Sequence, residues 1–472
     1  MKKLKLGFIC LVMCLTVFRS SITSFAEPTY TPGVTISENT DYPDTDANYQ
    51  VTFVYEAASN VKSVSLVGGF TFYTADQEAA YANGEAITYY TPYEYKDGMF
   101  PTGYAVSEYG YAPLPMNNVD GNLYEVTLPL PGSQYFYGFQ VTYDDGTTAT
   151  IKDPTNLPLA NGDSDSGWSL IYVGNQNDCI EGQEYVYPRT DGKTGTVSYV
   201  EYTAIDGSTQ PLGIYLPYGY DSSKTYKTIY LSHGGGGNEV EWMNIGSANN
   251  IMDNLIAEGE VAEAIIVTMD NTYFSFESGD SLKNIVECII PYIEENYSVS
   301  KKAEDRAMSG LSSGGSVTVQ AMLYSNETFA YYGVFSPSRT MDFVKETLTE
   351  EMIKTFPNAI QYYVSVGIYD SAVRRNVNVQ VYEELEKAGA NVEFKWKNGA
   401  HDWGVWRNQF SEFVKDYLWD VEAKETPITP NPSESDVVTG DTTDIQLLLA
   451  MSFLSLTGMG VLVFNKKKKI LK

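Results

Sequence analysis

The chain has 472 residues, of which 43% are hydrophobic and 19% are charged, and its formal net charge is −29. This length allows about two or three domains with separate cores, and the composition excludes a disordered or fibrous protein. The negative charge argues against a nucleic-acid partner, because neutralising phosphates requires clustered Lys and Arg.

The first 26 residues have the pattern of a secretory signal peptide. Lysines stand at positions 2, 3 and 5, an apolar run covers residues 6–18, and small residues lead to Ala26. A basic start, a short apolar stretch and a small-residue exit are the three parts of such a signal. We therefore expect residues 1–26 to be removed on export.

Residues 33–178 are expected to form an all-β domain. Segments that alternate apolar and polar residues begin at Gln50, Ser63 and Leu123, and a hairpin turn is predicted at Asp144-Asp145-Gly146. Short strands with turn signals at this spacing predict an immunoglobulin-like sandwich. A Tyr-rich stretch from Tyr73 to about Asn122 is expected to be a long loop within it.

From residue 196 to 421 the pattern changes to strands that alternate with helices. The predicted elements are strands at 227–232 and 262–269 and helices at 248–258 and 282–297, the last broken in its middle by Pro291. This alternation predicts a mostly parallel sheet covered on both faces. Residues 179–195 are expected to link this α/β domain to the sandwich.

A glycine-rich loop follows the strand at 227–232 and reads His233-Gly-Gly-Gly-Gly237. Consecutive glycines let the backbone approach a substrate and aim N–H groups at a developing oxyanion. We expect an amide near Gly235 to form this oxyanion hole together with the amide of Ser313. His233 itself is expected to form structural hydrogen bonds rather than to act as a base.

Gly310-Leu311-Ser312-Ser313-Gly314 matches the nucleophile elbow G-x-S-x-G. Its glycines allow a sharp turn from a strand, predicted at 306–309, to a helix, predicted at 317–324. A hydroxyl becomes a good nucleophile only when a base takes its proton. Ser312 is therefore the predicted nucleophile, and the alternative is a Gly/Ser loop without this role.

The chain holds only two histidines, and the later one, His401, lies in a glycine-containing loop close to the end of the α/β domain. Its place after Ser312 fits the order Ser, acid, His, so it is the predicted general base. Asp370 follows an apolar strand that begins at Gln361 and is the predicted acid that orients the imidazole. Asp402, the neighbour of the histidine, and Glu393, on an edge-like strand, are the competing acids.

Two of the four cysteines, Cys10 and Cys14, belong to the predicted signal peptide. Export permits a disulfide between the other two, Cys179 and Cys288. However, Cys288 lies in an apolar helical pattern and Cys179 in the linking segment. We therefore expect free or buried thiols rather than a bridge.

The C-terminus has three parts: a Pro/Ser/Thr-rich stalk at 422–444, an apolar run at 445–464 and a basic tail at 465–472. An apolar run of about 20 residues is long enough to span a bilayer as a helix, and a basic cluster after it stays cytoplasmic. This arrangement resembles the sorting signals of Gram-positive wall-anchored proteins, although the usual Leu-Pro-x-Thr-Gly is absent. We expect export and retention at the surface of a Gram-positive-type bacterium through a membrane or wall anchor.

The motifs together resemble carbohydrate esterase family 1, which contains feruloyl and acetylxylan esterases and is related to the esterase D and mycolyltransferase group. The likeness is carried by His233–Trp242, Gly310–Gly315 and His401–Trp406, and it covers about Gly195 to Leu418. It implies an α/β-hydrolase fold and a serine esterase that forms an acyl-enzyme and needs no metal or other cofactor. The sequence departs from the family at Ser313, where Met is frequent.

The resemblance implies plant cell-wall polysaccharide esters as substrates, and we expect a monomer. Trp242, Trp403 and Trp406 lie in or beside the motif loops, where flat rings could stack on a phenolic acyl group. For this reason we expect feruloyl esters, rather than acetyl esters, to be the better substrates. The alternative is that these rings pack the loops, which is the preferred interpretation for Trp242. Acyl transfer and glycan binding without catalysis stay open as other functions.

The N-terminal region resembles the early-set sandwiches akin to carbohydrate-binding module family 48, on the segments 134–139 and 153–156. This resemblance implies a domain that could bind carbohydrate. Trp168 could stack on a sugar or pack against the α/β domain. The oxygens of 161–165 could bind calcium, although a solvated turn is the preferred interpretation.

Overall fold

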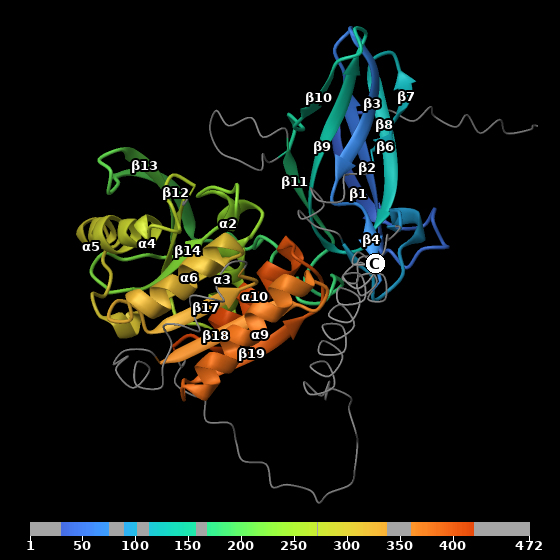
Figure 1. Cartoon of the computed structure of the whole chain (residues 1–472). Coiled ribbons are helices and arrows are strands. Elements are labelled where there is room, and N and C mark those ends of the chain that lie inside the picture. Colours follow the sequence, from blue (N-terminus) through green and yellow to red (C-terminus); the bar gives the residue numbers. More distant parts are fainter. Residues whose placement is uncertain are drawn as a thin grey trace, which may run out of the picture. The chain divides into compact units, whose positions relative to one another are not determined.

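A computed structural model describes residues 30–74, 89–101, 113–156, 168–270, 272–337 and 360–419 (Figure 1). By their contacts these residues belong to one compact unit, whose limits are Met1 and Val421. The predicted signal peptide (1–26), stalk (422–444), apolar run (445–464), basic tail (465–472) and calcium segment (161–165) lie outside the described residues. No helix within the described ranges is long and apolar enough to cross a membrane.

Two antiparallel sheets form the N-terminal part, coloured blue to teal in Figure 1. Their orders are β1-β2-β8-β7 and β10-β9-β3-β6, with β11 beside β9. Residues at alternate positions of both sheets, such as Val51 and Phe53 in β2 and Leu66 in β3, share one apolar core. The predicted sandwich is therefore confirmed. The strands are β1 Gly33–Glu38, β2 Tyr49–Glu56, β3 Val61–Gly68, β6 Leu114–Pro115, β7 Asn117–Asp120, β8 Leu123–Leu130, β9 Ser133–Tyr143, β10 Thr148–Ile151 and β11 Ser169–Val173.

The Tyr-rich stretch contains more regular structure than the loop predicted from the sequence. A short antiparallel ribbon joins β4 (Phe72–Tyr73) to β5 (Phe100–Pro101), and a 3-10 helix, η1, covers Pro92–Glu94. Strands of two residues are too short to show a period in the sequence. The predicted hairpin, in contrast, is present: β9 pairs with β10, and Gly146 adopts φ +85° in the turn.

An eight-stranded sheet forms the C-terminal part, in the order β12-β13-β15-β14-β16-β17-β18-β19. The pairs β12–β13 and β13–β15 are antiparallel, and all the others are parallel. This arrangement confirms the predicted α/β-hydrolase sheet. The strands are β12 Thr196–Thr203, β13 Thr209–Leu216, β14 Lys227–Ser232, β15 Ala264–Met269, β16 Arg306–Leu311, β17 Tyr331–Phe335, β18 Gln361–Gly367 and β19 Val392–Lys397.

Helices cover both faces of this sheet and create two apolar cores. Within β15, Ile265 and Val267 point into one core and Ile266 into the other, so the whole strand is buried. A strand covered on both faces explains the continuous apolar run in its sequence. The helices are α2 Glu241–Asn244, α3 Ala248–Glu258, α4 Asp280–Asn284, α5 Ile290–Asn296, α6 Ser313–Tyr324, α9 Ala372–Lys387 and α10 Trp403–Asp416, with a 3-10 turn, η4, at Ala303–Asp305.

The predicted break at Pro291 is wrong, because the helical run continues through it. Between α4 and α5 lies a π-helical turn, η3, at Ile285–Ile289, and the N–H of Ile290 bonds to the oxygen of Ile285. Proline lacks an N–H and crowds the carbonyl four residues earlier. The wider π turn places Pro291 at the start of α5, where that N–H is not required.

Candidate active site

The predicted site residues all follow the carboxyl ends of parallel strands. The glycine loop follows β14, Ser312 follows β16, and the loops with Asp370 and His401 follow β18 and β19. Since β14, β16, β17, β18 and β19 run parallel in this order, these ends lie at one edge of the sheet. In open α/β sheets this is the edge where ligands bind.

Ser312 has a backbone conformation that residues other than glycine rarely adopt. Its φ of 52° and ψ of −113° place it in the turn between β16 and α6. Its N–H donates to the oxygen of Phe335 at 2.9 Å, and its own oxygen accepts from the N–H of Ser316 at 3.0 Å. Such conformations cost about 1–3 kcal/mol and persist only where the surroundings impose them.

The glycines of the elbow are required by close backbone contacts. A Cβ added at Gly310 would lie 2.5 Å from the oxygen of Gly314, and one at Gly314 would lie 2.3 Å from the oxygen of Ser232. Any larger residue at these positions would push α6 away from the sheet. The strand–turn–helix context that the motif predicts is therefore present.

The glycine loop lies directly against this elbow. A Cβ added at Gly234 would lie 3.5 Å from the Cβ of Ser312, and one at Gly235 would lie 3.4 Å from the Oγ of Ser313. Ser313 opens α6, so its N–H has no acceptor within the helix and carries the positive end of the helix dipole. The structure thus brings together Gly235 and Ser313, the two residues predicted for the oxyanion hole.

His233, the first residue of this loop, is 2% exposed. Its Nδ1 lies 2.5 Å from the oxygen of Gly234, and its Nε2 lies 3.4 Å from Oδ1 of Asp270. Burial would raise the pKa of Asp270, but hydrogen bonds from His233 and Thr272 outweigh this effect and bring the pKa below its ordinary value. These contacts fit the structural role expected for His233.

His401 and Asp370 form a direct contact. Nδ1 of His401 lies 2.8 Å from Oδ2 of Asp370, whose side chain is completely buried. Oδ1 of Asp370 accepts from the N–H of Ser371 at 2.7 Å and lies 3.6 Å from Nη1 of Arg374. These partners supply the hydrogen bond and positive charge that a buried carboxylate requires. The imidazole keeps 16% exposure.

The two competing acids are occupied elsewhere. Asp402 caps α10: its Oδ1 accepts from the N–H of Val405 at 3.0 Å and its Oδ2 from the N–H of Ala400 at 3.1 Å. Glu393 is exposed on β19, the last strand of the described sheet. Among the three carboxylates considered, the contact with the imidazole is therefore made by Asp370.

The three tryptophans considered for substrate binding are buried. Trp242, Trp403 and Trp406 are 1%, 2% and 5% exposed. Their rings meet edge to face, Trp403 with each of the other two, and Trp406 also packs edge to face on His401 at 4.9 Å. This burial favours the alternative interpretation, in which the rings pack the loops.

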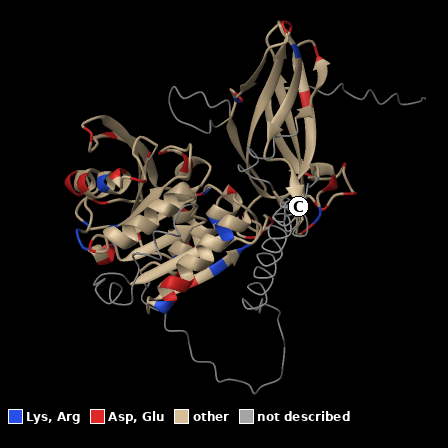
Figure 2. Ribbon diagram, viewed as in Figure 1, with Lys and Arg blue, Asp and Glu red and all other residues tan. Residues whose placement is uncertain are grey.

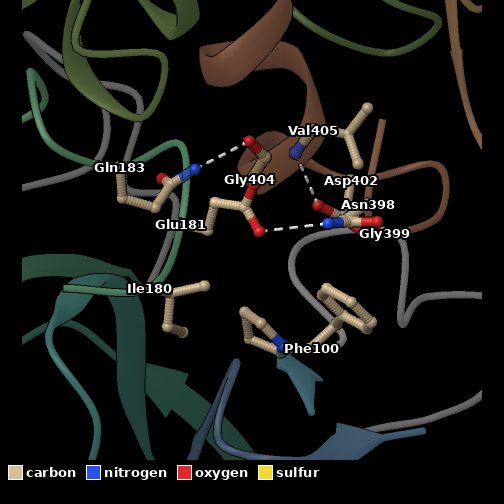
Figure 3. A pocket seen from close by; sticks show the side chains of 10 residues that line it. Phe100, Ile180, Glu181, Gln183, Asn398, Gly399, Asp402, Gly404 and Val405 are labelled. Carbon is tan, nitrogen blue, oxygen red and sulfur yellow. Dashed lines mark hydrogen bonds between the residues drawn. The ribbon is translucent and has the colours of Figure 1, made fainter. Parts of the chain in front are cut away.

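Several contacts at the His401 loop could not be read from the sequence. Glu181 accepts a hydrogen bond from Asn398 at 3.2 Å, and Gln183 donates one to the oxygen of Gly404 at 2.8 Å (Figure 3). Phe100 of the sandwich lines the same small pocket. A weak sequence signal did exist in Gly367, where a Cβ would lie 2.4 Å from the oxygen of Ala400, so the acid and base loops meet there.

No group of three or more His, Cys, Asp and Glu side chains in the described ranges could hold a metal ion. Cys179 and Cys288 are both free, as expected.

Residues 204–417 match the family model described as a putative esterase. This match covers less than half of the chain and shows a similarity to that esterase family. Over 240 residues the chain is 33% identical to an endo-1,4-beta-xylanase/feruloyl esterase of Xylanibacter ruminicola, a match that covers 48% of this chain and 32% of that protein. Over 151 residues it is 32% identical to endo-1,4-beta-xylanase Y of Acetivibrio thermocellus, covering 30% and 14%. The chain thus spans a third or less of the length of these relatives.

Among solved structures, the enterobactin esterase of Shigella flexneri, determined in the presence of enterobactin, matches with a TM-score of 0.50. The match covers 82% of this chain and 96% of that one at 14% identity, so it shows a likeness of fold alone. Coverage of this extent reaches beyond residues 204–417 and therefore includes part of the N-terminal region.

Proposed function

We propose that the chain is a serine carboxylesterase in which Ser312 is the nucleophile, His401 the general base and Asp370 the acid that orients the base. The observation that carries this proposal is the contact between Nδ1 of His401 and Oδ2 of Asp370, at the sheet edge where the strained elbow of Ser312 lies. By accepting a hydrogen bond from the Nδ1–H group, Asp370 fixes the tautomer that leaves Nε2 free to take a proton.

In the first half of the reaction, Oγ of Ser312 attacks the ester carbonyl while Nε2 of His401 takes the hydroxyl proton. The N–H groups of Ser313 and Gly235 stabilise the oxyanion of the tetrahedral intermediate. The intermediate collapses by breaking the bond to the alcohol oxygen, and His401 returns its proton to that oxygen. The acyl group remains on Ser312 as an ester.

In the second half, a water molecule replaces the alcohol. His401 takes a proton from this water as it attacks the acyl carbonyl, and the same two N–H groups stabilise the second oxyanion. Collapse releases the carboxylic acid and restores the Ser312 hydroxyl with the proton from His401. No step requires a metal ion or another cofactor.

The proposed substrates are acyl esters of plant cell-wall polysaccharides, with feruloyl preferred over acetyl. The support is the family resemblance and the relatives, one of which is named an endo-1,4-beta-xylanase/feruloyl esterase. The buried tryptophans add no support, since they are packed against one another and are at most 5% exposed.

Purified protein assayed on methyl ferulate and on a matched methyl acetate tests this proposal, with Ser312→Ala as the control for background hydrolysis. We expect the higher kcat/KM for methyl ferulate. A higher kcat/KM for the acetyl ester would overturn the feruloyl preference alone. Absence of hydrolysis of both esters, together with no labelling of Ser312 by a fluorophosphonate, would overturn the serine esterase itself.

A further inference from the structure

The β4–β5 ribbon of the sandwich contacts both loops that carry the proposed acid and base. Tyr73, at the end of β4, is 2% exposed, and its hydroxyl lies 3.4 Å from Oδ2 of Asp402, the neighbour of His401. Its ring meets the ring of Tyr369, the neighbour of Asp370, edge to face at 6.5 Å. Phe100, the partner of Tyr73 in the ribbon, packs on the same Tyr369 at 5.6 Å.

Asp402 is bonded to the backbone on both sides of His401. Its carboxylate joins Ala400, before the histidine, to Val405, in the first turn of α10. The hydroxyl of Tyr73 is a further donor to Oδ2 of Asp402, the same oxygen that accepts from the N–H of Ala400. Because the carboxylate is buried, losing one donor leaves it poorly compensated and allows it to shift.

Tyr369 has a similar link to the base loop. Its N–H donates to the oxygen of Gly399 at 3.0 Å, and the N–H of Ile368 donates to the oxygen of Lys397 at 2.8 Å. The rings of Tyr73 and Phe100 therefore pack on Tyr369, the residue through which the loop of Asp370 is bonded to the loop of His401. Glu181 and Gln183, from the segment after the sandwich, hold the same base loop at Asn398 and Gly404 (Figure 3).

We propose that Tyr73 and Phe100 are positioning residues, through which the sandwich keeps Asp370 and His401 in the geometry that proton transfer requires. The inference rests on the proposed function and assigns the sandwich a part in the rate of catalysis, separate from any binding of carbohydrate. Displacements of about 1 Å in a catalytic group can lower a rate by about a hundredfold. Partial loosening of the loops by one substitution is therefore expected to lower kcat by on the order of tenfold.

The test compares Tyr73→Phe and Phe100→Ala with Tyr137→Phe in the full chain. Tyr137 is the matched control, because its buried hydroxyl donates to Asp153 at 2.7 Å within the sandwich core. Each protein is assayed for kcat and KM on methyl ferulate and for the rate of Ser312 labelling by a fluorophosphonate. Thermal unfolding is recorded for each, and all rates are measured below the onset of unfolding.

We expect Tyr73→Phe and Phe100→Ala to lower kcat and the labelling rate by the same factor, with KM unchanged. Tyr137→Phe should lower the unfolding temperature while kcat and labelling stay at the wild-type values. Wild-type kcat in both ribbon variants would overturn the inference, and so would a rise in KM alone, which would indicate contact with substrate. If the wild-type protein neither hydrolyses esters nor labels, the proposed function fails and the inference fails with it.

Discussion

The reactivity proposed for Ser312 depends on a backbone conformation that its neighbours impose. Gly310 and Gly314 have no space for a Cβ, and the N–H of Ser312 is fixed to Phe335. The serine hydroxyl is therefore presented by the packing of β16, α6 and β17 rather than by its own preference.

Ser312→Ala and His401→Ala are expected to lower kcat by several orders of magnitude, because each removes a member of one acting unit. Both variants should keep the wild-type unfolding temperature within a few degrees, since neither side chain is a large part of a core. The measurement is kcat on methyl ferulate beside a thermal melt. A folded His401→Ala protein with wild-type turnover would remove the histidine from its role.

Asp370→Asn is expected to lower kcat by on the order of ten-thousandfold, since the amide NH2 group can donate to Nδ1 and so favours the tautomer in which Nε2 carries the proton and cannot act as the base. Glu393→Gln is the matched control, a carboxylate-to-amide change on the exposed side of β19 that should leave kcat unchanged. Steady-state kinetics on methyl ferulate measure kcat for both variants. Near wild-type turnover in Asp370→Asn, combined with complete loss in Asp402→Asn, would reassign the acid.

At the scale of elements, the predictable parts were those with a local signal. The apolar runs located β14 and β15, and the glycines located the elbow, because each pattern follows from the backbone of its own segment. The contact of Tyr73 with Asp402 joins residues 329 positions apart, and no local pattern carries it. The orientation of Trp403 and Trp406 depends in the same way on which side of α10 meets the sheet, so their burial could not be predicted, whereas packing was already the preferred interpretation for Trp242.

Helix α2 brings an acidic group behind the glycine loop. A Cβ added at Gly237 would lie 2.2 Å from Oε2 of Glu241, the first residue of α2. Burial raises the pKa of Glu241 from 4.5 to about 7, with Asp270 adding to the rise and His233 opposing it. The unfolded chain therefore loses this proton at lower pH than the folded protein does.

This difference predicts that the contribution of Glu241 to stability falls as the pH rises from about 4.5 to about 7, because the folded state binds more protons at this group in that window. Glu241→Gln removes the titration, so its stability relative to wild type should increase through the same window by about 1–3 kcal/mol. Urea unfolding at pH 4.5 and pH 8 measures this effect. An equal difference between the two proteins at both pH values would contradict it.

On the scale of the whole molecule, acidic residues occur in both the sandwich and the α/β part (Figure 2). With a formal net charge of −29, the chain repels other acidic surfaces, which favours solubility. The domain limits of 33–178 and 196–421 remain a prediction, because contacts place both parts in a single unit. Tyr73 and Phe100 of the sandwich contact Asp402 and Tyr369 of the α/β part. Contacts of this kind join the two predicted domains into one unit.

Export and surface retention are proposed from the sequence of the two ends. Deleting all residues after Ser435 removes the apolar run and the basic tail, and we expect the shortened protein to be released into the medium with its wild-type kcat. Activity measured in cell and medium fractions tests this expectation. Equal retention of the full and shortened proteins on cells would contradict an anchor at 445–464.

The alternation along β19 has a consequence for self-association. Within the described residues β19 is an edge strand, and the backbone of an edge strand can pair with the same strand of another copy and begin aggregation. Every second side chain is charged, at Glu393, Lys395 and Lys397, while Val392 and Phe394 pack on the core. Lys397 is paired with Glu412, whereas charges at Glu393 and Lys395 disfavour the addition of a further strand, so β19 can end the described sheet.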